Sequence, residues 1–79
     1  MNWKDHIVAN PEILVGKPAI KGTRISVEFL LDCFASGWDY DDILKSYPHL
    51  NRKQVQAAMA FTAEVFKDAR LAAIRKASS

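Results

Sequence analysis

The sequence predicts a mainly α fold in which three helices, in helix-turn-helix order, follow a short N-terminal β-arm. Three runs of apolar residues at helical spacing predict the helices, and each run follows a residue that commonly caps a helix: Ser26, Asp39 or Asn51. Residues 1–25 contain two glycines and two prolines among short apolar stretches, which favours turns and extended segments. We therefore expect an arm over residues 1–25 and a trihelical domain over residues 26–79.

The first two helices are expected to be short. The first begins after Ser26 and ends before Gly37, because glycine readily adopts the left-handed conformation that stops a helix. The second lies between Asp39 and Pro48, where Trp38 can pack against Ile43 as a hydrophobic staple. Their apolar faces hold Val27, Leu30, Leu31 and Phe34 in the first helix and Tyr40, Ile43, Leu44 and Tyr47 in the second.

The third helix is expected to begin after Asn51, with Gln54 at the capping-box position and Leu50 and Val55 as a second staple. Because no glycine or proline interrupts residues 52–76, we expect a long helix of about 16–25 residues. Its apolar face holds Val55, Ala58, Met59, Thr62, Val65, Phe66, Ala69 and Ala73.

In the arm, residues 6–8 and 18–20 are expected to pair as a two-stranded ribbon, and Asn10 with Pro11 predicts a turn between them. A ribbon of two strands is marginal in water by itself. It must therefore lie on the helices or pair with another subunit.

A chain of 79 residues forms one domain of marginal stability, and such domains usually gain stability from disulfides, metals or association. Cys33 is the only cysteine, and His6 and His49 have no further ligands at zinc spacing. We expect no metal and no cofactor, and we expect self-association. The sequence shows no signal peptide and no membrane span, which predicts a cytoplasmic protein.

The sequence gives no support for catalysis, and we expect the protein not to be an enzyme. Ser26, Asp32 and His49 do not follow the order of a known catalytic triad, and the glycines at positions 16 and 22 lack P-loop spacing. Cys33 lies beside the apolar face of the first helix, where we expect it to be a small buried hydrophobic residue.

The basic charge lies at both ends of the chain. Residues 1–24 carry +2, residues 25–51 carry −4 and residues 52–79 carry +4. Two short helices followed by a longer basic helix is the order of a trihelical DNA-binding domain, whose last helix enters the major groove. Arginine, lysine and glutamine on its outward face can contact phosphates and base edges. The candidate DNA contacts are Arg52, Lys53, Gln54, Gln56 and Lys67 on the third helix and Lys21 and Arg24 in the arm.

Other interpretations of these polar residues stay open. Any solvated helix presents arginine, lysine and glutamine outward, and the aspartates that begin the second helix would repel phosphates. Arg24 can reach a minor groove, as basic arms do, or it can have a structural role, either capping a C-terminus or pairing with an acid such as Asp32 or Asp42, and we favour the structural role. The aspartates concerned are Asp39, Asp41 and Asp42.

Three apolar residues of the third helix, Phe61, Leu71 and Ile74, lie off its apolar face. Single exposed apolar side chains are common, but three on one helix of a small domain favour a second packing surface. We expect that surface to bind a second copy or another protein chain.

A longer pattern carries a family resemblance. It comprises Gly16-Lys17-Pro18-Ala19-Ile20-Lys21-Gly22-Thr23-Arg24-Ile25-Ser26-Val27, then Gly37, Ile43-Leu44, Tyr47-Pro48-His49-Leu50, and finally Val55 with Ala57-Ala58. With this pattern, residues 13–61 resemble a bacterial and archaeal family known as domain of unknown function 433 and described as antitoxin-like. The resemblance implies a homeodomain-like fold with a β-arm, usually dimeric, and the antitoxin half of a toxin–antitoxin pair whose partner is a PIN-like nuclease.

Two hypotheses follow from the residues and the resemblance together. The first is a dimeric DNA-binding regulator of antitoxin type that reads operator DNA with the start of the third helix. The second is a protein-interaction module that neutralises a PIN-like nuclease without binding DNA. The acidic second helix and the apolar residues off the main face favour the second hypothesis.

Overall fold

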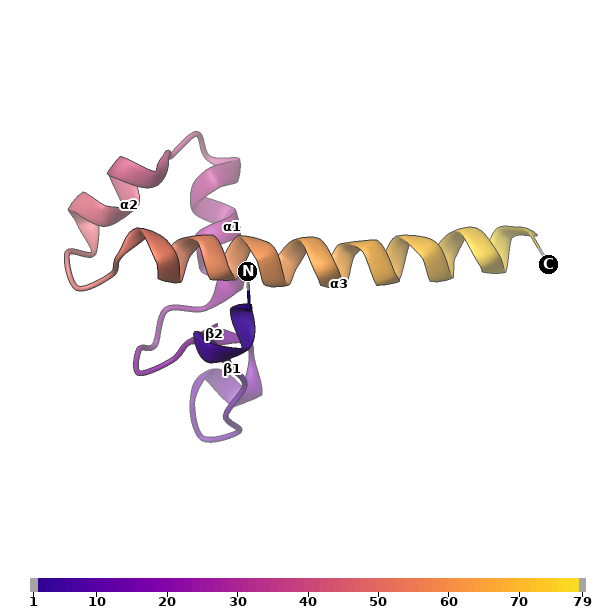
Figure 1. The fold of residues 1–79 in the computed structure, drawn as a ribbon, viewed down its shortest axis with the longest axis horizontal. Coiled ribbons are helices and arrows are strands. Elements are labelled where there is room, and N and C mark those ends of the chain that lie inside the picture. Colours follow the sequence, from indigo (N-terminus) through magenta and orange to yellow (C-terminus); the bar gives the residue numbers. More distant parts are fainter. Residues whose placement is uncertain (1, 79) are drawn as a thin grey trace.

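The computed structural model describes the backbone of residues 2–78 and the side chains of residues 2–69. Three helices and a small antiparallel ribbon form one mainly helical unit, as predicted (Figure 1). In chain order the elements are the 3₁₀ turn η1 (Trp3–Asp5), strand β1 (Ile7–Val8), the 3₁₀ turn η2 (Leu14–Gly16), strand β2 (Ala19–Ile20) and the helices α1 (Val27–Ala35), α2 (Tyr40–Ser46) and α3 (Arg52–Ser78).

The predicted caps precede all three helices. Before α1, the Ser26 hydroxyl accepts a hydrogen bond of 2.9 Å from the backbone N–H three residues later. Asp39 and Asp42 exchange side chain–backbone hydrogen bonds before α2, and Asn51 and Gln54 do the same before α3. Each bond satisfies a backbone N–H that helix geometry leaves without a partner, which stabilises the fold by about 1 kcal/mol per cap.

Glycines fix the turns at both ends of α1. Gly37 has a φ of +95° and donates its N–H to the Phe34 carbonyl at 3.0 Å, so it ends α1 as predicted. Gly22 has a φ of +79°, and the Thr23 N–H donates to the Ile20 carbonyl at 3.0 Å. These are the features of a type II turn, which requires glycine at its third position. This turn leads the chain from β2 toward α1.

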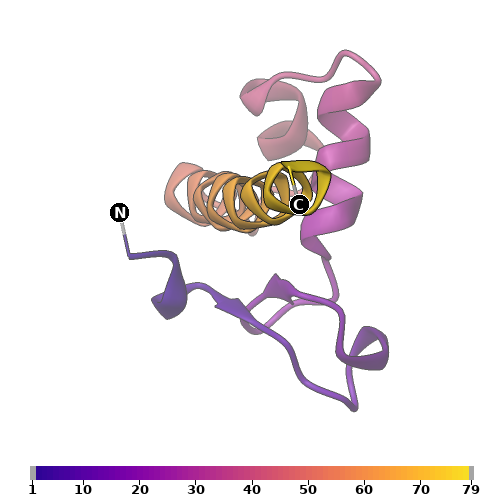
Figure 2. The same cartoon turned by 90° about the vertical axis from the view of Figure 1, so that its right-hand side faces the viewer.

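The two strands form the predicted ribbon, with Ile7 opposite Ile20 and Val8 opposite Ala19. The sequence required the ribbon to lie on the helices or to pair with another subunit. Both strands contact α3, so the ribbon lies on the helices. Figure 2, which looks along α3, shows the N-terminal segment running beneath that helix. The arm of residues 1–25 therefore packs against the helices of its own chain.

Between the strands the chain makes the predicted turn and then a left-handed one. The Ile13 N–H donates to the Asn10 carbonyl at 2.9 Å across Pro11. Leu14 and Val15 then have φ values of 53° and 56°. A β-branched residue in this region is strained by about 1–3 kcal/mol. The Val15 side chain is 92% exposed, so its own packing does not offset that strain.

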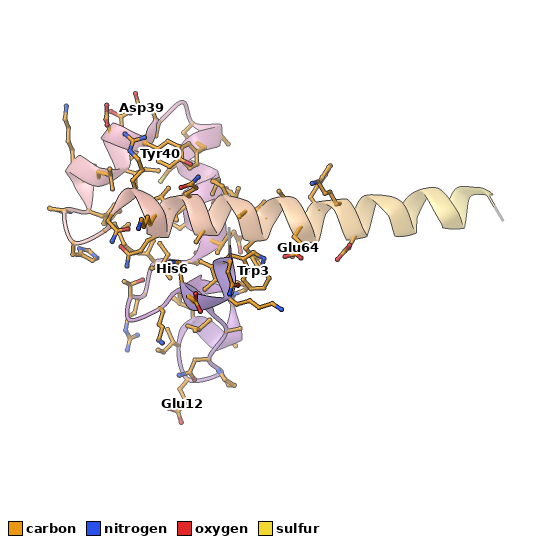
Figure 3. The ribbon with its side chains drawn as sticks, in the orientation of Figure 1. Trp3, His6, Glu12, Asp39, Tyr40 and Glu64 are labelled. Atoms are coloured by element: carbon orange, nitrogen blue, oxygen red, sulfur yellow. The ribbon has the colours of Figure 1, made fainter. Side chains whose placement is uncertain are left out.

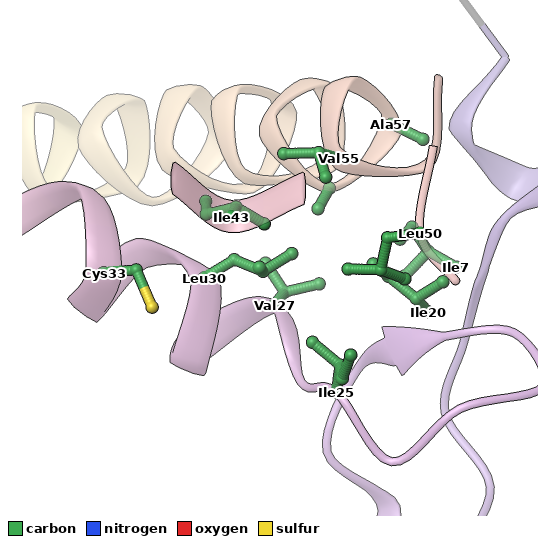
Figure 4. Close-up of a cluster of buried hydrophobic side chains, with 11 residues drawn as sticks. Ile7, Ile20, Ile25, Val27, Leu30, Cys33, Ile43, Leu50, Val55 and Ala57 are labelled. Carbon is green, nitrogen blue, oxygen red and sulfur yellow. The ribbon is translucent and has the colours of Figure 1, made fainter. Parts of the chain in front are cut away.

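The core lies where α1, α2 and the ribbon meet the first half of α3 (Figure 4). Its largest fully buried side chains come from four elements: Ile20 from β2, Leu30 from α1, Ile43 from α2 and Val55 from α3. Residues 1–25 and 26–79 thus share one core. The other buried residues are Ile7, Ala19, Ile25, Val27, Cys33, Leu50, Ala57 and Ala58.

Cys33 has the buried position that its place on the first helix predicts, with 7% of its surface exposed. Burial raises the pKa of the Cys33 thiol, and the neighbouring Asp32 carboxylate raises this pKa further. Because the thiolate is the reactive form of cysteine, the side chain acts as a packing residue.

The buried parts of the apolar faces of α1 and α3 differ from those that the sequence predicted. Leu31 is 37% exposed, and on α3 Val65 is 49% exposed and Phe66 62% exposed, although all three were expected in the core. The physical reason on α3 is its length: it runs for 27 residues and continues past the elements that could cover Val65 and Phe66. On α1 the core-facing stripe passes instead through Cys33.

Phe61 is more buried than the sequence predicted. The sequence placed it off the core face, whereas it is half-buried and packs edge-on against Trp3, with ring centroids 4.8 Å apart. The N-terminal segment covers this side of α3, and helical periodicity carries no information about that segment. The side chains of Leu71 and Ile74, expected to share a surface with Phe61, lie outside the described residues.

The difference in burial between Val55 and Val15 predicts different effects of the same Val→Ala substitution on the free energy of unfolding. Val55→Ala removes fully buried methyl groups and is expected to lower the free energy of unfolding by about 2 kcal/mol. Val15→Ala removes an exposed side chain and relieves part of the left-handed backbone strain, so it is expected to leave the free energy of unfolding unchanged or to raise it by up to about 1 kcal/mol. Urea denaturation followed by circular dichroism measures both. Equal losses for the two variants would contradict this core.

Candidate nucleic-acid interface

The first two turns of α3 divide their side chains between the core and the solvent. Val55 and Ala58 are fully buried, whereas Arg52, Lys53 and Gln56 are exposed. The structure therefore brings three of the sequence-predicted contacts together at the start of this helix. Exposed cationic and amide side chains in this position can bind phosphates and base edges.

Arg52 is held across the gap between α3 and α2. One guanidinium nitrogen lies 3.4 Å from an Asp41 carboxylate oxygen, and the guanidinium carbon lies 5.1 Å from the centre of the Tyr40 ring. In Figure 3, Tyr40 lies close to the first turns of α3. A solvent-exposed ion pair contributes at most about 1 kcal/mol. A guanidinium has five N–H donors, so the single bond to Asp41 leaves donors for a ligand.

Gln54 and Lys67 differ from the other predicted contacts on α3. The Gln54 side-chain oxygen accepts the Asn51 N–H at 2.8 Å, which gives this half-buried residue a capping role. Lys67 is exposed, but it lies about 20 Å along the helix from Lys53. The continuous polar surface at the start of α3 thus comprises Arg52, Lys53 and Gln56.

The N-terminal segment limits how far this surface extends along α3. Trp3 packs on Phe61 and donates its indole N–H to the Glu64 carboxylate (Figure 3). Trp3 and Glu64 border a shallow hollow of about 480 Å³ between η1 and α3, which Lys67 also lines. The middle of the outward face therefore lies beside η1, and the first two turns are its open part.

Lys21 and Arg24 lie in the turn between β2 and α1, and both are exposed. The ion pair of Arg24 with Asp32 or Asp42, one of its two possible structural roles, is not present: in the part of the chain with described side chains, the ion pairs are Lys17–Glu28 and Arg52–Asp41. Buried Ile20 and Ile25 anchor this turn at both ends. Lys21 and Arg24 are therefore displayed on a fixed turn that belongs to the folded unit.

Three exposed carboxylates at the start of α2 lie beside this surface, those of Asp39, Asp41 and Asp42. Asp39 and Asp42 accept the capping hydrogen bonds of α2, and Asp41 pairs with Arg52. Each carboxylate thus has a structural role. Their negative charge nevertheless opposes an approaching phosphate.

Sequence reasoning missed two partners of the candidate surface, Tyr40 beneath Arg52 and Trp3 beside Glu64. Tyr40 was assigned to an apolar face, and no periodic signal links position 3 to a helix more than fifty residues later. In the residues searched, no cluster of three or more His, Cys, Asp or Glu side chains could hold a metal ion. No helix in the described part has the length and apolar character of a membrane span.

The comparisons with known proteins identify the family. No curated protein matches the chain. Among solved structures, the fold is similar to that of a DUF433 member protein from Anabaena variabilis ATCC 29413, with a TM-score of 0.76 and 25% sequence identity. The match covers 82% of this chain and 64% of that protein, so the chain spans less than two thirds of its relative's length. The family model described as a protein of unknown function, DUF433, matches residues 7–62, and the chain belongs to this family.

Proposed function

We propose that the protein is a DNA-binding regulator of antitoxin type that acts as a cytoplasmic homodimer and not as an enzyme. The observation that carries the proposal is the exposed surface of Arg52, Lys53 and Gln56 on the first turns of the third helix of a helix-turn-helix unit. In such units the N-terminal residues of the last helix contact base edges in the major groove.

The chemistry of the surface supports this role. Arginine can make paired hydrogen bonds to guanine, glutamine can do so to adenine, and lysine contacts phosphate as a point charge. The Tyr40 ring beneath the Arg52 guanidinium favours one orientation of Arg52 before any ligand arrives. The α2 carboxylates reduce the net attraction, so DNA binding depends on contacts made by these three residues more than on overall charge.

Loss of the Lys53 charge tests the surface directly. Lys53→Ala is expected to weaken binding to a DNA fragment of the protein's own promoter region by about 5- to 10-fold, and to reduce the salt dependence of log Kd by about one unit of slope per protomer, or about two units for the homodimer. Mobility-shift titrations at several salt concentrations measure both.

Lys4→Ala is the matched control, because it removes the same charge from an exposed site on η1, a different part of the molecule. We expect it to change Kd by less than about 2-fold. Absence of a shift for the folded wild-type protein at low salt would refute DNA binding. Equal effects of the two substitutions would show that only net charge matters.

Removal of a neighbouring carboxylate is expected to have the opposite effect. Asp41→Asn removes a negative charge beside the surface and should tighten DNA binding by about 3-fold. Glu12→Gln, which removes a carboxylate charge from the exposed turn between the two strands, is the control and should leave Kd nearly unchanged. Fluorescence anisotropy with labelled promoter DNA measures the difference. Weaker binding by Asp41→Asn would argue against phosphate repulsion at this position.

The second candidate function is binding and neutralising a PIN-like nuclease without binding DNA. The exposed carboxylates of Asp39, Asp41 and Asp42 favour it, because a compact acidic surface complements a basic surface of another protein. Under this function the product of a neighbouring gene should copurify with the wild-type protein. Copurification should be lost with Asp41→Lys, which reverses one of these charges. A product that copurifies equally with both would exclude this surface as its binding site.

A further inference from the structure

An apolar groove lies between α1 and α3, and none of the candidate DNA contacts lines it. It has a volume of about 390 Å³, and its walls include Leu31 from α1 and Phe61, Val65 and Phe66 from α3. The polar side chains of its lining are confined to Thr62 and the Lys17–Glu28 pair, whose charged atoms are 3.3 Å apart. The groove therefore offers an almost wholly apolar floor.

The groove gathers exposed apolar side chains in one place. Leu31, Val65 and Phe66 all line it, with exposed fractions of 37%, 49% and 62%. Isolated exposed apolar residues are ordinary on a protein surface, but a contiguous apolar patch usually marks an interaction site.

The chain exposes more surface than a folded monomer of its size. A protein of 8.9 kDa is expected to expose about 4,800 Å², and this one exposes 5676 Å². The excess of about 900 Å² is close to the area of about 800 Å² that each partner contributes to a standard protein–protein interface. The radius of gyration is likewise 14.0 Å, against about 11.6 Å for a compact chain of this length.

The source of this excess is visible in Figure 1, where the C-terminal part of α3 extends beyond every other element. A helix of this kind gains most of its stability from packing. It cannot fold back into the groove of its own chain, because the groove lies along the same unbroken helix. A second copy of the chain can both fill the groove and cover the projecting helix, because each chain has a groove and a projecting helix.

The distribution of charge also favours a second copy of the chain as the occupant of the groove. Helix α1 carries Glu28 and Asp32 and no basic residue, whereas residues 70–79 carry three basic residues and no acidic one. A C-terminal half of α3 that enters the groove of another copy would bring this basic segment toward the acidic α1.

We propose that the groove between α1 and α3 is the surface on which two copies associate, each receiving the projecting part of its partner's α3 across a two-fold axis. A two-fold pair of this kind uses the same patch on both chains and closes without further growth. The inference deepens only the homodimer of the proposed function and does not depend on DNA binding.

Sedimentation equilibrium of the full chain without DNA tests the proposal. The wild type should sediment with twice the 8.9 kDa mass of one chain. Val65→Glu and Phe66→Glu each place a carboxylate in the groove and should raise the dissociation constant of the dimer by about 100-fold. Val15→Glu is the matched control, because it makes the same substitution at an exposed valine outside the groove, and it should leave the dimer intact.

Circular dichroism of each variant checks that helix content is unchanged, and Phe66→Ala provides a second groove variant that introduces no charge. A monomeric wild type would overturn the proposal, including one that associates only with a different protein. It would also be overturned if the groove variants stayed dimeric or if the control lost the dimer as well. Because DNA is absent, failure here leaves the nucleic-acid surface untouched.

Discussion

The core of this protein depends on contact with one helix, α3. The helices α1 and α2, both strands and the turn η1 all pack against it. Ala57 and Ala58 are fully buried on α3, and their small side chains let neighbouring segments approach its backbone closely. No disulfide can join parts of a chain with a single cysteine. Burial against α3 is therefore what combines the ribbon and the three helices into one core.

The features that were correctly predicted from the sequence are local ones. The caps at Ser26, Asp39 and Asn51 involve residues three positions apart, and the ribbon follows from short apolar stretches between turns. The exposure of Val65 and Phe66 could not be predicted, because periodicity identifies the apolar face of a helix but not where its covering ends. That limit is set by the other elements, which contact only the first part of α3.

In the candidate site, too, the features set by neighbouring residues could be predicted from the sequence, whereas the contacts between distant residues could not. The exposed positions of Lys53 and Gln56 follow from the helical period once Val55 is assigned to the core. The placement of Arg52 against Tyr40 and Asp41 depends on how α2 crosses α3, which no short pattern encodes. Trp3 is a further case, because its contact with Phe61 joins residues at nearly opposite ends of the described chain.

The unbroken course of α3 has a consequence for the spacing of the two candidate DNA surfaces in the proposed dimer. The helix is a rigid rod that rises about 1.5 Å per residue, so Lys53 lies about 20 Å from Phe66 along its axis. In a pair of antiparallel α3 helices centred near Phe66, the two basic ends would be separated by about 40 Å. Successive major grooves on one side of B-DNA recur every 34–36 Å or so. If the proposed dimer binds DNA, the length of α3 therefore sets the distance between the two half-sites that it can contact.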